Sequence, residues 1–236
     1  MLPSPFFGFL LYQRCSPQKG LRNSTKGLTK MNENYQIKKV EKTICTEFLS
    51  KYHYLSKQGY SHRSGTNYGL FDEKDKLVGV AVFHGVSAWE TVKGCFGLEN
   101  KEQKGFWELG RFALDDEHHS KNMASWFLAR CIKQLRKDTE VRALISYADS
   151  EVHNGGLYAA VNFKYYGLTA PKKDFWVKQA DGTYKKQSRG GTKGVDGEWR
   201  PRSRKHRYLM VFDKTLTVQW TQQPYPKTAT PSSGTP

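Results

Sequence analysis

The chain has 236 residues and a formal net charge of +16, from 38 Lys and Arg against 22 Asp and Glu. This length suits one compact domain with appendages, or at most two small domains. Hydrophobic residues make up 37% of the sequence and aromatic residues 14%, which excludes a wholly disordered chain. The excess of positive charge favours a polyanionic partner, and nucleic acid fits better than an anionic membrane surface.

The cysteines and the N-terminal segment indicate an unanchored protein of a reducing compartment. The four cysteines are widely spaced and contain no Cys-x-x-Cys pair, so neither a zinc site nor a disulfide framework is indicated. The apolar run Pro5–Tyr12 is too short to span a bilayer and lacks the charged segment that precedes a signal sequence. We expect residues 1–30 to be a disordered extension, and we hypothesise that Met31 is the natural start.

The hydrophobic pattern predicts strands that alternate with helices in the second half of the chain, which is typical of a mixed α/β sheet with some parallel pairing. Helices are predicted over 43–54, 122–137 and 155–161, and strands over 67–71, 77–83, 106–114, 141–148, 163–167 and 206–212. The first two strands form a predicted hairpin. Two segments, 179–205 and 222–236, have linker composition and are expected to be poorly ordered.

The unit from Trp107 to Lys137 combines a strand, an acidic and histidine-rich turn, and a helix. A helix N-terminus presents unpaired N–H groups and a partial positive charge, which suit a cofactor phosphate. Asn122 is a candidate N-cap and Ser125 lies in the first turn. An ordinary capped helix without a ligand is the alternative. The neighbouring His118 and His119 are adjacent residues, which rarely point at one metal ion.

Four further residues are candidates for chemistry. Asp149 ends a predicted strand and Tyr158 lies on the helix that follows, where ligand sites of α/β sheets gather; Asp149 is equally suited to capping a turn. Arg111 interrupts an apolar strand and requires an anionic or hydrogen-bonding partner, either a ligand or a structural partner such as Glu108 or Asp149. His53 could be an acid/base, a metal ligand or neither.

With these residues identified, the chain resembles the phage Mom DNA-modification proteins, a divergent branch of the GNAT acyltransferase fold. The resemblance covers about residues 50–170 and rests on an ordered set of short motifs. They are His53-Tyr54 with Ser56, Glu108-Leu109-Gly110-Arg111 with Leu114-Asp115-Asp116, Asn122-x-x-Ser125, Ser146-Tyr147-Ala148-Asp149, and Tyr158-Ala159-Ala160-Val161-Asn162-Phe163 with Tyr165 or Tyr166 and Gly167.

The resemblance implies a GNAT-like α/β domain over residues 31–221, with a mixed, mostly antiparallel central sheet flanked by helices and a basic insertion at 179–205. It implies a transferase that converts the exocyclic N6 amine of adenine in double-stranded phage DNA to a carbamoylmethyl adduct, in the host cytoplasm, as protection from restriction. Acetyl-CoA or a related acyl donor is implied, although acetyl transfer alone would give a different product. The donor and any metal stay open. The turn 117–122 would replace the glycine-rich pyrophosphate loop of ordinary GNAT enzymes, which this sequence lacks.

In this hypothesis Arg111 anchors an anion of cofactor or substrate, while Asn122 and Ser125 contact cofactor phosphate. Asp149 and Tyr158 handle protons or orient the reacting groups, and His53 is a further candidate. Because the target amine lies inside a stacked duplex, the base must be flipped and held by aromatic rings. The available tyrosines are Tyr52, Tyr54, Tyr60, Tyr147 and Tyr158.

The segment 172–207 carries twelve Lys and Arg against four Asp and Glu, which suits an arm that grips DNA phosphates. The predicted DNA contacts are Lys185, Lys186, Arg189, Arg202 and Arg204. A merely solvated loop is the alternative for this segment. For the whole protein, the alternatives are an N-acyltransferase acting on a protein, RNA or small amine, and a basic DNA-binding protein without catalysis.

Overall fold

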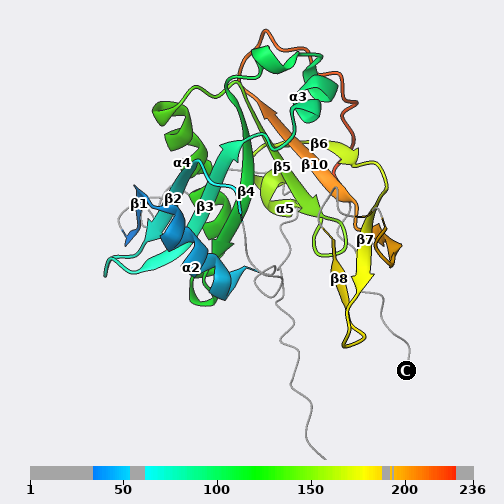
Figure 1. Ribbon diagram of the computed structural model, residues 1–236. Coiled ribbons are helices and arrows are strands. Elements are labelled where there is room, and N and C mark those ends of the chain that lie inside the picture. The colour runs from blue at the N-terminus through cyan, green and yellow to red at the C-terminus, as the bar shows by residue number, and fades with distance from the viewer. Residues whose placement is uncertain (1–33, 54–61, 188–191, 193, 227–236) are drawn as a thin grey trace, which may run out of the picture.

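A computed structural model describes residues 34–53, 62–187, 192 and 194–226 (Figure 1). The expectations for residues 1–30 and Met31 lie outside the described residues, as do Tyr54, Tyr60 and Arg189. The strands are β1 (Gln36–Lys39), β2 (Thr66–Phe71), β3 (Leu77–Gly85), β4 (Phe106–Leu114), β5 (Ala143–Asp149), β6 (Lys164–Leu168), β7 (Lys172–Lys178), β8 (Tyr184–Lys186), β9 (Gly197–Arg202) and β10 (Lys205–Val211). The helices are α2 (Lys42–Tyr52), α3 (Trp89–Phe96), α4 (Met123–Asp138) and α5 (Gly156–Ala160), with 3₁₀ turns η2 (Asn100–Glu102) and η3 (Asp116–His118).

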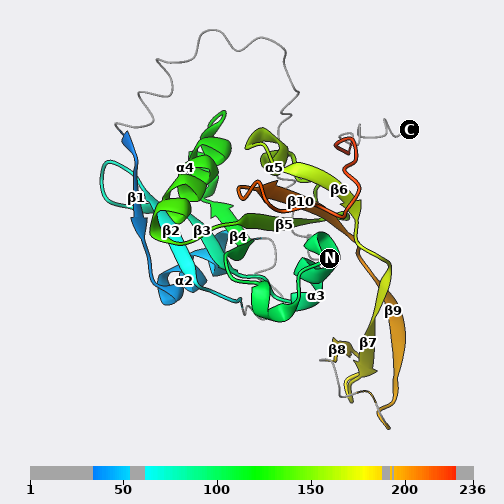
Figure 2. The same cartoon turned by 90° about the horizontal axis from the view of Figure 1, so that it is seen from above.

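Seven strands form the central sheet in the order β1-β2-β3-β4-β5-β10-β6. Only the β4–β5 pair among these described strands is parallel, and the other neighbours are antiparallel. Helices α4 and α5 cover one face, and α2 and α3 cover the other (Figure 2). The expected fold class, a mixed and mostly antiparallel sheet flanked by helices, is confirmed.

The main core lies between the sheet and α4. The apolar positions of this helix recur at helical spacing, so Phe127, Leu128, Cys131 and Leu135 are fully buried. Burying a side chain of this size stabilises the fold by about 1.5–3 kcal/mol relative to leaving it exposed. The helix predicted over 122–137 is therefore confirmed within one residue at each end.

The sheet is split between its two parallel strands. Their ladder joins Phe106–Leu109 to Ala143–Ser146 and stops there, although β4 runs on to Leu114 and β5 to Asp149 (Figure 1). At the same level β4 contains a bulge, since Val82 of β3 pairs with Arg111 and Phe83 pairs with Leu109, which leaves Gly110 without a partner. The facing backbone edges of β4 and β5 beyond Leu109 are thus outside the ladder; we call this region the split.

A second sheet, in the order β8-β7-β9, projects from one corner of the domain as an arm (Figures 1 and 2). The expectation of poor order over 179–205 is therefore wrong for β8 and β9. Composition was misleading because it does not encode contacts between strands, such as that of the Phe175 ring in β7 with the Trp199 ring in β9, whose centroids are 5.2 Å apart.

Part of the C-terminal segment also packs on the domain. The Gln223 amide donates to the Tyr165 carbonyl at 2.9 Å, and the Tyr225 hydroxyl donates to the Phe163 carbonyl at 2.5 Å. The expectation of a disordered tail from residue 222 is wrong for residues 222–226. Strand β1 and helix α3 are further elements that the sequence pattern did not predict.

Candidate active site at the split

The bulge directs Arg111 to the face of the sheet covered by α2. Paired residues of an antiparallel ladder point to the same side, and Val82, the partner of Arg111, packs with Phe48 of α2. One guanidinium N–H of Arg111 donates to the Gly110 carbonyl at 2.7 Å. This bond fixes the charged group at the bulge, directly beside the split.

Three buried histidines share this face with Arg111. His53, at the end of α2, is 8% exposed, His62 is 6% exposed and His84, in β3, is 7% exposed. Burial, together with the nearby positive charge of Arg111, lowers the pKa of His53 to about 4. Burial and Arg111 also lower the pKa of His62. At neutral pH, His53 and His62 are therefore neutral imidazoles beside a fixed positive charge, able to accept a proton or to bind a metal.

His84 lies against the bulge. Its Nδ1 is 2.8 Å from the Gly85 carbonyl, and since a carbonyl only accepts, Nδ1 donates this hydrogen bond and Nε2 is the ring nitrogen that faces Gly110. A Cβ atom added at Gly110 would lie 2.3 Å from that Nε2. Glycine at this position therefore lets the imidazole pack directly on the backbone of β4.

Asp149 ends β5 and accepts hydrogen bonds from the Ser203 hydroxyl at 2.8 Å and the Glu151 amide at 3.2 Å. It pairs in register with Lys205 of β10. Burial lowers the pKa of Lys205 and of His153, and the Asp149 carboxylate opposes both shifts. Asp149 therefore caps a turn, and its charge also acts on His153 and Lys205 beside the split. The capping role and the site role predicted for Asp149 are compatible.

Tyr158 lies on the opposite face of the sheet. Its hydroxyl donates to the Tyr147 carbonyl of β5 at 3.4 Å, and its ring packs on Tyr208 and Phe163 with centroids 5.0 and 5.6 Å away. The predicted site residues therefore form two groups, with His53, Arg111 and Asp149 on the face of α2 and Tyr158 on the face of α5. The split lies between these groups.

The start of α4 shares the face of Tyr158. Asn122 occupies the N-cap position, as predicted, with φ 68°, although its side chain makes no capping hydrogen bond. The Ser125 hydroxyl donates to the Asn122 carbonyl at 3.0 Å, and must rotate to donate to a ligand. The first-turn N–H groups of α4 could bind a phosphate, and the backbone of β4 and β5 that is not paired beyond Leu109 could bind an extended chain attached to it.

The turn before α4 contains a second polar group. Ligand atoms of Asp115, Glu117 and His118 lie within 4.8 Å of one another. His118 Nδ1 lies 2.5 Å from Asp115, and Lys76 lies 3.5 and 3.2 Å from Asp115 and Glu117. These contacts account for the group as a hydrogen-bonded turn, and His118 and His119 do not act as a pair in it.

Five residues at the split escaped prediction as site residues: His62, His84, His153, Ser203 and Lys205. They come from four separate stretches of the chain. Their one signal in the sequence was that His62 lies near His53 and His153 lies near Asp149. The five side chains come together only in the folded protein.

The profile of the Mom protein family matches residues 34–227. A comparison with curated protein sequences finds no match. No helix among the described residues is long and apolar enough to cross a membrane.

Solved structures that are similar to the chain include three acetyltransferases. The ribosomal-protein-S18-alanine N-acetyltransferase of Escherichia coli is 13% identical, with a TM-score of 0.43 over 75% of this chain and 93% of that chain. A spermidine/spermine N-acetyltransferase of Vibrio cholerae, in complex with manganese ions, is 12% identical, with a TM-score of 0.44 over 77% and 94%. An acetyltransferase of Bacillus subtilis in complex with CoA is 13% identical, with a TM-score of 0.44 over 75% and 99%.

Proposed function

The chain belongs to the Mom protein family, and on this premise we propose that it is a transferase that converts the N6 amine of adenine in double-stranded phage DNA to a carbamoylmethyl adduct, which protects the DNA from host restriction. The single observation that carries the proposal is the position of Arg111 among neutral, buried histidines beside the split. An acyl-CoA-type donor and the host cytoplasm are parts of the same proposal.

The reaction requires help for a poor nucleophile. The lone pair of the adenine amine is delocalised into the ring, so a base must take the N6 proton as the N6–carbon bond forms. The leaving group then departs with the electron pair of the bond that breaks. His53 is unprotonated at neutral pH, since its pKa is about 4, and it would take the N6 proton as this proton becomes strongly acidic during formation of the N6–carbon bond. Since N6 is bonded to a methylene carbon in the product, the leaving group departs from that carbon, and Arg111 would hydrogen-bond the adjacent carbonyl oxygen of the donor and orient it for this displacement.

The donor would lie across the sheet. The first-turn N–H groups of α4, with Asn122 and Ser125, would hold its phosphate, and the unladdered edges of β4 and β5 would hold its extended part. When bound, such a donor supplies the carbon that N6 attacks. Tyr158, on the α4 side of the split, would give a proton to the leaving group, while Asp149 orients His153 and Lys205 on the other side.

The arm is the proposed grip on DNA. Its root is joined to the site, because Ser203 donates to Asp149 at 2.8 Å and the Ser150 hydroxyl donates to the Arg204 carbonyl at 2.8 Å. Duplex held along the arm would therefore pass close to the split. A flipped adenine would be held by tyrosines such as Tyr52, which is 38% exposed at the end of α2.

The two faces of the arm differ in chemistry. On one face the basic groups have acidic partners, since Lys186 lies 2.5 Å from Asp174 and Arg200 is paired with Glu198. On the other face Trp199 is 56% exposed, and Lys173 and Lys185 are exposed on the same side by register. The second face is the better candidate for the DNA contact because Lys173 and Lys185 form no salt bridge within the part of the chain that the structure describes.

The test is mass spectrometry of nucleosides from DNA co-expressed with the protein. We expect a new adenine adduct that is lost in Arg111→Ala, while Arg136→Ala, a matched change in the last turn of α4, keeps it. Unmodified adenine despite tight DNA binding would indicate a DNA-binding protein without catalysis. Transfer from labelled acyl-CoA to a protein, RNA or small amine would indicate the other N-acyltransferase activity.

A further inference from the structure

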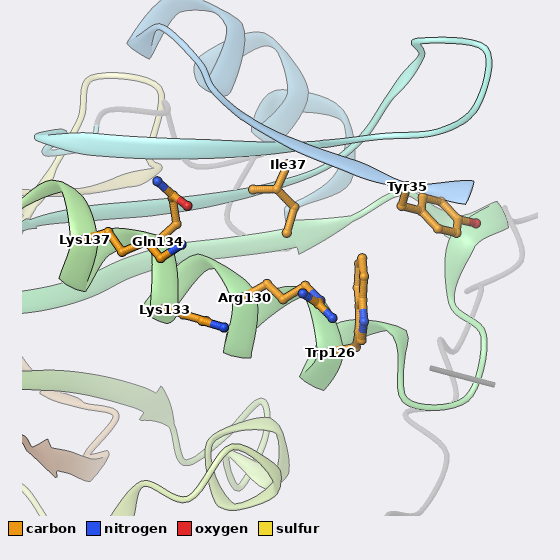
Figure 3. Close-up of a pocket in the computed structure, with 7 residues that line it drawn as sticks. All are labelled: Tyr35, Ile37, Trp126, Arg130, Lys133, Gln134 and Lys137. Carbon is orange, nitrogen blue, oxygen red and sulfur yellow. The ribbon is translucent and has the colours of Figure 1, made fainter. Parts of the chain in front are cut away.

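A groove lies between α4 and the edge strand β1, away from the split (Figure 3). Its volume is about 270 Å³. The lining residues are Tyr35, Ile37, Trp126, Arg130, Lys133, Gln134 and Lys137. The groove shares none of its lining residues with the candidate active site, although Trp126 directly follows Ser125 in α4.

The groove is basic. Three of its seven lining residues are Arg or Lys and none is acidic. Arg130, Lys133 and Lys137 follow one another at spacings of three and four residues, so they lie on one face of α4 and repel one another. An anion in the groove would relieve this repulsion.

Asp138, which directly follows Lys137 in α4, is already engaged. Asp138 accepts hydrogen bonds from Tyr68 at 2.7 Å and from Gln134 at 2.9 Å, and pairs with Lys39 at 3.1 Å. It neutralises Lys39, an exposed residue of β1, rather than the cations that line the groove. The positive charge of the groove therefore remains available to a ligand.

Two buried donors in the groove have no acceptor. Trp126 is 7% exposed, and neither its Nε1 nor the Nε of Arg130 has a hydrogen-bond partner among the described residues. The guanidinium of Arg130 points toward the Trp126 ring, 4.9 Å from its centroid (Figure 3). A buried donor without an acceptor is unfavourable, and the oxygen atoms of an anionic ligand would supply the missing acceptors.

We propose that this groove binds the phosphate of a nucleotide, either free or within a DNA strand. Phosphate oxygens match the set of donors, and Tyr35 with Ile37 offers an apolar wall for the attached sugar and base. The volume suits one nucleotide and is too small for a larger cofactor. This inference does not depend on the proposed reaction.

The experiment measures binding of AMP and of a DNA duplex to three variants of the full chain. Arg130→Gln combined with Lys133→Gln removes two charges, and Trp126→Phe removes the indole donor but keeps a ring. Lys51→Gln combined with Lys101→Gln removes two exposed charges elsewhere and serves as the control. Melting temperatures establish that each variant is folded.

If the ligand is a free nucleotide, AMP binds the wild type, and its Kd rises about tenfold in each groove variant but not in the control, as expected for loss of one hydrogen bond to a charged group. If the ligand is part of DNA, AMP does not bind, and duplex affinity falls more in the Arg130/Lys133 variant than in the control. A wild type that binds neither probe, or equal affinities in the groove and control variants, would overturn the inference. Because no step uses modified adenine, these outcomes are separate from those that test the proposed reaction.

Discussion

Ser146 lies opposite Leu109 in the last rung of the parallel ladder, and its hydroxyl donates to the Leu109 carbonyl at 3.1 Å. The side chain is fully buried at the point where β4 and β5 separate. This bond therefore fastens the closed end of the split and sets where the two strands part.

Ser146→Ala should lower the free energy of unfolding by about 1 kcal/mol, the usual net contribution of one hydrogen bond. It should also reduce adenine modification, because the separation of the strands is less well fixed. Urea denaturation and nucleoside mass spectrometry measure the two effects. Ser150→Ala, which removes an exposed hydrogen bond to the Arg204 carbonyl, is the control for stability. Equal stability of the Ser146 variant and the wild type would contradict this role.

Gly110→Ala should impair catalysis more than folding. The added Cβ would come within 2.3 Å of His84 Nε2, so the imidazole must move away from the bulge. Gly85→Ala is a matched control, since a Cβ there meets no atom within 4 Å. We expect a loss of modification of at least about tenfold for Gly110→Ala, if misplacing the ring raises the barrier by about 1.4 kcal/mol. Unchanged modification rates in both variants would show that the position of His84 is irrelevant to the reaction.

The buried histidines should make stability fall on acidification. His53 has a pKa of about 4 in the folded protein and about 6.5 when unfolded. Its contribution is complete above pH 6.5 and is lost as the pH falls toward 4, because the unfolded chain then binds the extra proton. The full loss is about 3 kcal/mol.

Urea denaturation at pH 7 and at pH 4.5 tests this for His53→Gln. The variant should lose less stability than the wild type over that interval, while His119→Gln, an exposed control, should behave like the wild type. Parallel loss of stability in His53→Gln and the wild type would mean that His53 is not the group that titrates.

The two adjacent lysines of β8 should differ in their effect on DNA binding. Lys186 is paired with Asp174 at 2.5 Å, whereas Lys185 lies on the face of Trp199. Lys185→Gln should weaken binding and lower the slope of log affinity against log salt by about 1, as for one lost phosphate contact. Lys186→Gln should have a smaller effect. Fluorescence anisotropy across a salt series measures both, and the reverse order would place DNA on the other face.

Residues 222–226 should contribute to stability. A chain that ends at residue 221 loses the bonds from Gln223 and Tyr225 to the carbonyls of Tyr165 and Phe163, and we expect about 1–3 kcal/mol less stability for two such bonds. A chain that ends at residue 226 keeps both bonds and is the control. Thermal unfolding of the two chains gives the comparison, and equal melting temperatures would mean that the segment is dispensable.

The sequence predicted an element best where apolar residues recur at one regular spacing, as they do in a helix with one buried face. The apolar spacing around Phe127 defined α4, and Arg111 stood out because a charge interrupted an apolar strand. Local pattern could not find His84 or Lys205 as site residues, since each looks ordinary within its own strand. Their importance arises from the bulge at Gly110 and the pairing of β5 with β10, which are properties of the folded chain.

The arm was missed for the opposite reason. Its strands are short, and their stability comes from cross-strand contacts such as Arg200 on Tyr184, 4.0 Å from the ring centroid. Such pairs depend on register, which composition does not encode. The segment 179–205 therefore looked like a linker, although its basic character was evident.

The chain leaves the central sheet for the arm and returns to it at one corner, where the Thr169 amide donates to the Lys205 carbonyl at 2.8 Å. Because the residues at which the chain enters and leaves the arm are hydrogen-bonded to each other, a short hairpin turn could replace the arm. The order of strands in the central sheet would not change. Arms of other lengths or surfaces could be grafted at the same junction. The junction at Thr169 and Lys205 is thus a position where the arm could be replaced while the seven-stranded sheet stays unchanged.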